Sequence, residues 1–143
     1  MDIIKFKEIF DRNKILFIIL FISFTASIVY SFYFQIRPQV DARAYDTIAW
    51  NLVQGYGYRE NLDVDILHDY AIARVGPLYE YLLAGVYVVF GHRYEAVWIL
   101  QAFLHSFTAY LVYLLALLIF KFDERKKTIG LVSAAIFGFY PDL

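Results

Sequence analysis

The chain has 143 residues, of which 61% are hydrophobic and 20% aromatic, and its formal net charge is −1. Because this hydrophobic share exceeds the roughly 45–50% of soluble domains, the chain cannot cover its apolar surface in water, and lipid is the expected solvent. The near-neutral charge gives no reason to expect a nucleic-acid partner. The absence of cysteine excludes disulfides and thiolate metal sites.

The first apolar segment covers residues 15–34 and carries no charge. A helix of about 20 residues crosses the hydrocarbon core of a bilayer. A cleaved signal peptide is the alternative, favoured by the basic residues within 1–14, but the aromatic Tyr30, Phe32 and Tyr33 do not suit a small-residue cleavage site. We therefore expect residues 1–14 in the cytoplasm and a transmembrane helix at 15–34.

Residues 35–95 are expected to form an external loop with two juxtamembrane helices. The first is predicted at 42–54, because its apolar side chains share one helical face and Gly55 follows. The second is predicted at 77–90. It would be about 21 Å long and contains Glu80, so we expect it to lie at the interface rather than to cross. The alternative is a tilted true span.

The second transmembrane helix is predicted at 96–120, which holds no charge, and a basic connector follows at 121–127. Residues 128–143 are expected to begin a third transmembrane helix. Gly130, Ala134 and Gly138 form a row of small residues at four-residue spacing there, a pattern that lets another helix approach closely. Because this last helix is incomplete, the chain is expected to be the N-terminal portion of a larger membrane protein.

The lysines indicate the topology. They all lie before the first span or after the second, at Lys5, Lys7, Lys14, Lys121, Lys126 and Lys127. By the positive-inside rule both groups face the cytoplasm, which requires an even number of crossings between them. The sequence thus predicts an all-α polytopic membrane protein with about three transmembrane helices, an incomplete bundle, whose large loop is extracytoplasmic in the cell (inner or plasma) membrane.

Polar side chains elsewhere have simpler explanations. Gln101, His105 and Thr108 form a stripe in the second span that either bonds neighbouring helices or lines a lipid groove. The pairs His68 with Asp69 and His92 with Glu95 fall short of the spacing of a metal site and are interpreted as loop residues. We therefore expect no metal and no cofactor.

Residues 41–58 carry the clearest functional signal, in the pattern Asp41-x-x-x-Tyr45-Asp46-x-Ile48-Ala49-x-x-Leu52-x-x-Gly55-x-Gly57-Tyr58. This pattern resembles the first external loop of the C-type integral-membrane glycosyltransferases, the relatives of protein mannosyltransferases and aminoarabinose transferases. The likeness continues through Arg74-Val75-Gly76-Pro77-Leu78-Tyr79 and to Leu100-Gln101-Ala102 and Tyr140-Pro141. It covers nearly the whole chain, although each motif alone is degenerate.

The resemblance implies transfer of a sugar from a polyprenyl-phosphate donor to an extracytoplasmic acceptor, with inversion at the sugar carbon. The family's loop acid corresponds to Asp41, which would activate the acceptor hydroxyl. Arg74 would face the donor phosphate, and Tyr45 and Asp46 of the same motif are candidate substrate-binding residues. From spacing alone, Asp41 also suits a helix N-cap and Arg74 an interfacial arginine whose charge reaches water.

Two departures from the family pattern matter. Glu80 stands where many relatives have a second proline, and the further helices and polar loops of these enzymes are absent. The chain alone is therefore expected to be inactive. The alternatives are a non-catalytic small membrane subunit, packing through the Gly130, Ala134 and Gly138 face, and a remnant that binds lipid-linked sugar without turnover.

Overall fold

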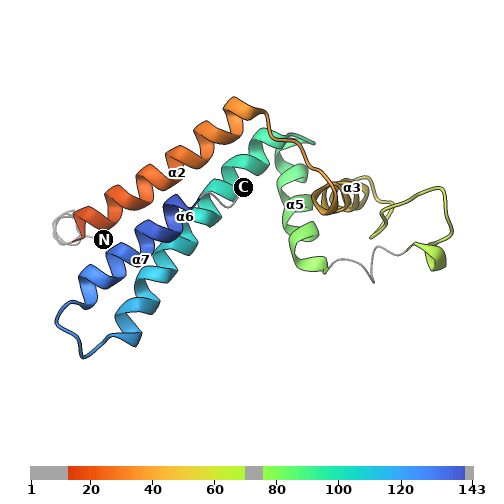
Figure 1. Cartoon of the computed structure of the whole chain (residues 1–143). Helices are drawn as coiled ribbons and strands as arrows, with labels where there is room; N and C mark the ends of the chain where they lie inside the picture. Colours follow the sequence, from red (N-terminus) through yellow and green to blue (C-terminus); the bar gives the residue numbers. More distant parts are fainter. Residues whose placement is uncertain (1–12, 70–75, 141–143) are drawn as a thin grey trace, which may run out of the picture. The chain divides into compact units, whose positions relative to one another are not determined.

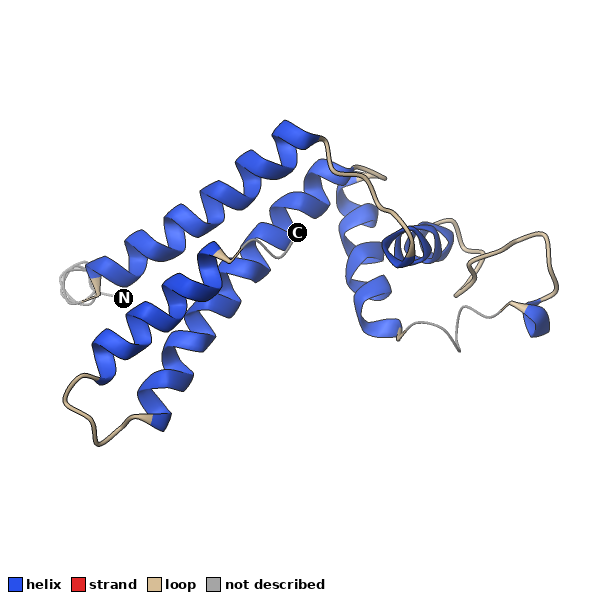
Figure 2. Ribbon diagram, in the orientation of Figure 1, coloured by secondary structure: helices blue, strands red, loops and turns tan. Residues whose placement is uncertain are grey.

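The computed structural model describes residues 13–69 and 76–140, which form five α-helices and no strand (Figure 2). The all-helical class expected from the sequence is confirmed for this part of the chain. The helices are α2 (Lys14–Phe34), α3 (Asp41–Val53), α5 (Pro77–Phe90), α6 (Tyr94–Ile119) and α7 (Lys126–Phe139), with a short 3-10 turn, η1 (Ile66–His68).

The chain divides into two compact units. Residues 34–98 form one, here called the loop unit, and residues 1–33 with 99–143 form the other, here called the three-helix unit. The first five residues of α6 thus belong to the loop unit and the rest of this helix to the three-helix unit.

Two helices, α2 with 21 residues and α6 with 26, are long and apolar enough to cross a membrane. They match the spans predicted at 15–34 and 96–120, with starts one and two residues earlier. In α2 only Leu16 and Ser23 are buried, so most of its apolar surface has no protein cover. About three spans were expected, and two helices of the described residues have the length and composition of a span. With 14 residues, α7 is shorter than the roughly 20 that a crossing needs.

In the three-helix unit, α2, α6 and α7 lie side by side (Figure 1) around Leu16, Tyr113 and Ala134. Gly130, Ala134 and Gly138 are all buried. A methyl group at Gly130 would lie 2.8 Å from the ring of Tyr113, and one at Gly138 would lie 3.1 Å from Ser23 Oγ. The small residues therefore admit α6 and α2 of the same chain.

Hydrogen bonds to backbone carbonyls also join these three helices. Ser23 Oγ donates to Gly138 O at 2.9 Å, and Ser106 Oγ donates to Leu20 O at 3.0 Å. His105 Nε2 donates to the same Gly138 carbonyl at 3.3 Å. Within the polar stripe predicted in the second span, His105 thus bonds a neighbouring helix, whereas the hydroxyl of Thr108 donates to Leu104 O of its own helix.

In the loop unit, α3 packs against α5 (Figure 1). Their contact is centred on Ala49 of α3 and on Leu83, Ala84 and Tyr87 of α5, and Val97 joins the same cluster. A hydrogen bond of 2.9 Å from Trp98 Nε1 to Ile36 O ties the two ends of this unit together.

The ends of α3 and α5 follow local backbone signals. We expected the first helix at 42–54, but α3 begins and ends one residue earlier. The N-cap position is taken by Val40, with φ of +48°. Asp41, which the spacing also suited as the N-cap, is instead the first residue of the helix. At its other end Gly55, with φ of +83°, donates to Leu52 O while Tyr56 N donates to Asn51 O, the Schellman arrangement that ends many helices. The bounds predicted for α5 are confirmed.

Candidate functional site

The predicted site residues of the motif all lie in α3, but they have different surroundings. Asp41 is the first residue of the helix and is exposed, like Arg43 one half-turn later. A carboxylate in the first turn interacts favourably with the positive end of the helix dipole, worth about 0.3–1 kcal/mol. Asp41 therefore stands on a fixed helix end where an outside molecule can reach it.

Tyr45 is part of the packing between α3 and α5. Its ring meets the ring of Tyr79 edge to face, with centroids 5.6 Å apart and an interplanar angle of 86°. The side chain is half-buried and borders both apolar clusters of the loop unit. Edge-to-face pairs of this kind contribute about 0.5–1.5 kcal/mol beyond their buried area. Tyr45 thus helps to hold the helix that carries Asp41.

Asp46, expected to bind substrate, is 7% exposed and lies inside the loop unit. The Tyr87 hydroxyl donates to its Oδ1, and so does His92 Nε2 at 2.9 Å, while the Tyr94 hydroxyl donates to Oδ2 at 3.3 Å. A buried charge is tolerated when hydrogen bonds and a partner of opposite charge compensate it, and this carboxylate has three donors. Asp46 therefore ties α3 to the end of α5 and to the turn that follows.

Aromatic rings enclose this carboxylate. The imidazole of His92 stacks on Trp50 of α3 with centroids 4.7 Å apart and planes 10° from parallel. Tyr87 meets both rings edge to face. The pKa of Tyr87 lies well above its ordinary value, because burial disfavours the phenolate and because the hydroxyl donates to Asp46. The cluster of Asp46, Trp50, Tyr87, His92 and Tyr94 is here called the Asp46 cluster.

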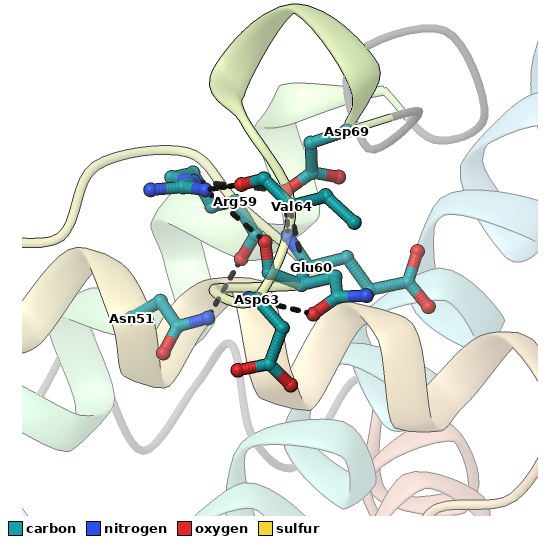
Figure 3. A network of polar contacts seen from close by, with 7 residues as sticks. Asn51, Arg59, Glu60, Asp63, Val64 and Asp69 are labelled. Atoms are coloured by element: carbon teal, nitrogen blue, oxygen red, sulfur yellow. Dashed lines mark hydrogen bonds and ion pairs between the residues drawn. The ribbon is translucent and has the colours of Figure 1, made fainter.

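A second polar network shapes the loop that follows α3 (Figure 3). Asp69 accepts hydrogen bonds from the backbone amides of Glu60 at 2.9 Å and Asn61 at 3.1 Å, and its carboxylate lies 3.9 Å from Arg59 Nε. The Arg59 guanidinium also donates to the carbonyl of Val64. Asn51 Nδ2 donates to Arg59 O at 2.8 Å, which fastens this loop to α3.

Glu80 is another carboxylate of the loop unit and is completely buried in the first turn of α5. Neither of its oxygens makes a hydrogen bond of ordinary geometry with the residues that the structure describes. Burial and the nearby Glu80 charge raise the pKa of Tyr58 to about 12. The charge of Glu80 thus acts on Tyr58, which lies just beyond the two turn glycines of the motif.

The remaining sequence candidates are placed as follows. Arg74, the expected donor-phosphate ligand, lies outside the described residues. His92, considered with Glu95 as a metal pair, bonds Asp46 instead. Across 13–69 and 76–140, no three side chains of His, Asp or Glu are grouped as metal ligands would be.

Sequence reasoning did not identify the partners of Asp46. They lie 41, 46 and 48 residues further along the chain, so no local spacing connects them. The available signal was the group of polar aromatic residues around Gly91, at the end of a helix too short to cross a bilayer.

Compared with models of known protein families, with curated proteins and with solved structures, the chain matches none.

Proposed function

We propose that this chain carries the acceptor-activating region of a C-type integral-membrane glycosyltransferase that uses a polyprenyl-phosphate sugar donor. The observation that carries the proposal is the mounting of Asp41. It is an exposed carboxylate at the start of a helix that the Asp46 cluster and the apolar contact with α5 hold in place. A general base needs both access to its substrate and a fixed orientation.

A membrane setting is supported by α2 and α6. Both have the length and composition of spans, and large apolar side chains such as Phe21, Phe103 and Leu118 are exposed on them. The residues between them, including α3 and the 14-residue α5, contain no lysine, whereas lysines flank both helices on the far side. The positive-inside rule then puts the loop unit on the extracytoplasmic side.

Labelling from the two sides of the membrane tests this topology. A cysteine at Asp63 is expected to react with an impermeant thiol reagent from outside, and a cysteine at Arg125 only after the membrane is opened. Labelling of both from the same side would refute the proposed arrangement. The absence of natural cysteines makes each probe unique within this sequence.

In the proposed reaction, an acceptor hydroxyl attacks the anomeric carbon of the donor sugar. The bond from this carbon to the phosphate oxygen breaks as the new carbon–oxygen bond forms, so the configuration inverts. Asp41 takes the hydroxyl proton, and the polyprenyl phosphate leaves with the bonding electrons. The positive charge of Arg74 would stabilise the charge that develops on the phosphate.

The test is an Asp41→Asn substitution in the product of the native gene, assayed in membrane vesicles by consumption of a labelled polyprenyl-phosphate sugar. Loss of a general base typically lowers the rate by about 10²–10⁴-fold. Asp63→Asn is the matched control, because Asp63 is also an exposed carboxylate of the loop unit. Equal rates for the two variants would refute the role of Asp41.

The alternative of a small membrane subunit loses its proposed contact surface. The row of Gly130, Ala134 and Gly138 is occupied by α2 and α6 of this chain. A partner would therefore have to bind another face, and the subunit hypothesis then predicts that Asp41→Asn leaves sugar transfer unchanged.

A further inference from the structure

A small cavity of about 130 Å³ lies in the three-helix unit, where α2 and α7 begin at the same end of the unit (Figure 1). Lys14, the first residue of α2, and Lys127, the second residue of α7, both line it. Most of the remaining lining is apolar and comes from Ile15, Leu16, Tyr113 and Leu131. The volume is below the roughly 300–1,000 Å³ of a complete small-molecule site. The cavity can therefore hold only a compact part of a ligand, such as one phosphate group.

The lining of this cavity carries two positive charges and, among the described residues, no negative one. Lys14 and Lys127 are exposed, and neither makes a hydrogen bond or an ion pair with the residues that the structure describes. Lys126 differs, because its ammonium group donates to Lys121 O at 3.1 Å. Asn13 also borders the cavity but has a contact of its own. Two ammonium groups that share one cavity repel each other, and an anion between them turns this repulsion into attraction.

The surrounding sequence does not neutralise these two charges. Residues 1–13 carry equal numbers of basic and acidic side chains, and the connector 121–127 carries four basic and two acidic ones. Of the two acids, Asp123 already accepts from the backbone amide of Arg125 at 2.7 Å. Tyr113 adds a further donor, since it lines the cavity at only 6% exposure and its hydroxyl makes no hydrogen bond with the described residues. The lining therefore selects an anion.

We propose that this cavity binds the phosphate of an anionic phospholipid. Lys14 and Lys127 contact the phosphate oxygens, and the apolar lining meets the carbon chain that a free phosphate lacks. Beyond Ile15, the exposed side chains of Ile18 and Ile22 continue along the same face of α2, so an acyl chain has an apolar path along this helix. Basic pockets between transmembrane helices on the cytoplasmic side, where the proposed topology puts this end, bind anionic lipid headgroups in this way.

The test titrates the native gene product in detergent micelles with phosphatidylglycerol or phosphatidylcholine and counts bound lipids by native mass spectrometry. Phosphatidylglycerol is expected to bind more tightly, because the lysines repel the choline ammonium group. Lys14→Gln and Lys127→Gln are each expected to weaken its binding about fivefold, and both together about 25-fold. Lys121→Gln is the matched control, since Lys121 is an exposed lysine of the adjoining connector that does not line the cavity, and it is expected to leave the affinity nearly unchanged.

Three results would overturn the lipid site. Equal affinity for the two lipids would show that the lining does not select an anion. Equal weakening by Lys121→Gln and Lys127→Gln would show a diffuse attraction by positive charge rather than binding in this cavity. Displacement of phosphatidylglycerol by inorganic phosphate would show a site for the free anion. Protection of a cysteine at the buried Ala134 checks that each variant keeps the three-helix unit folded. No measurement here involves Asp41 or a sugar, so failure of the lipid site and failure of the proposed transfer reaction are distinguishable.

Discussion

Replacing Asp46 with alanine tests whether the Asp46 cluster holds α3 in place. The substitution removes one acceptor from Tyr87, His92 and Tyr94 together. Tyr87 is only 2% exposed, so its hydroxyl remains buried without this acceptor, a loss of about 1–3 kcal/mol. The His92 side chain is 30% exposed, so water can replace its bond to the Asp46 carboxylate, and the 3.3 Å bond from Tyr94 is long. Loss of these two bonds therefore adds less to the destabilisation. We expect a total of about 3 kcal/mol.

Thiol labelling measures this loss directly. The chain has no natural cysteine, so Ala49→Cys places a single probe at a completely buried position of α3. When the unit recloses faster than the thiol reacts, the labelling rate reports the population of the open form. A destabilisation of 3 kcal/mol then raises the rate about 150-fold. A probe at Ala134→Cys, buried in the three-helix unit, is expected to be unaffected.

A double-mutant cycle identifies the interaction responsible. Tyr87→Phe removes only the hydroxyl, and its combination with Asp46→Ala should cost less than the sum of the two single effects by roughly 0.5–3 kcal/mol. Asp63→Ala is the control, because an exposed carboxylate is expected to change stability by less than about 0.5 kcal/mol. Additive effects of the two substitutions, or similar labelling rates in Asp46→Ala and Asp63→Ala, would refute the structural role of Asp46.

Two further predictions concern packing and pH. Gly130→Ala would place a methyl group 2.8 Å from the Tyr113 ring and 3.3 Å from the Tyr113 carbonyl oxygen. It should therefore lower the free energy of unfolding of the three-helix unit, measured in detergent, by about 1–3 kcal/mol. In the control Gly85→Ala the methyl group meets open space, so stability should be unchanged or higher. The folded chain keeps the Tyr58 proton up to a pKa of about 12, while the unfolded chain releases it near pH 10, so stability should fall as the pH rises between these values. Unfolding measured across this pH range should show a smaller fall in stability in Glu80→Gln. In Tyr58→Phe the contribution of the Tyr58 hydroxyl should be missing. A fall in stability that is unchanged in Tyr58→Phe would contradict its assignment to Tyr58.

The helix bounds followed from the sequence because local chemistry sets them. Pro77 suits the first turn of a helix, since its missing amide proton is not needed there, and Gly91 takes the positive φ of +74° at the other end of α5. The charge-free segments gave α2 and α6 to within two residues at each end. At the start of α3 the preference of the N-cap position for aspartate did not hold, because Val40 rather than Asp41 has that position.

The role of Asp46 could not be read from the sequence because it depends on distant contacts. Three residues before Ala49, it lies at the edge of the apolar face of α3, where polarity alone suggests an exposed side chain. Its burial follows from the donors that α5 and the turn after it supply. Tertiary contacts thus decide which of two neighbouring acids in one motif is buried.

Three carboxylates of the loop unit, those of Asp41, Asp46 and Glu80, differ in what they can contribute to a reaction. Glu80 is enclosed, and Asp46 already accepts three hydrogen bonds, so an incoming hydroxyl would have to displace an existing donor from it. Asp41 is exposed in the first turn of α3, where an outside hydroxyl can reach it. On this division, Asp41→Asn should abolish transfer without changing the labelling of a cysteine at Ala49. Asp46→Ala should lower transfer only as far as it releases α3, so transfer and labelling rates should change together across Asp46 variants. A variant of Asp46 that lost transfer while Ala49→Cys stayed protected would instead make Asp46 the group that meets the substrate.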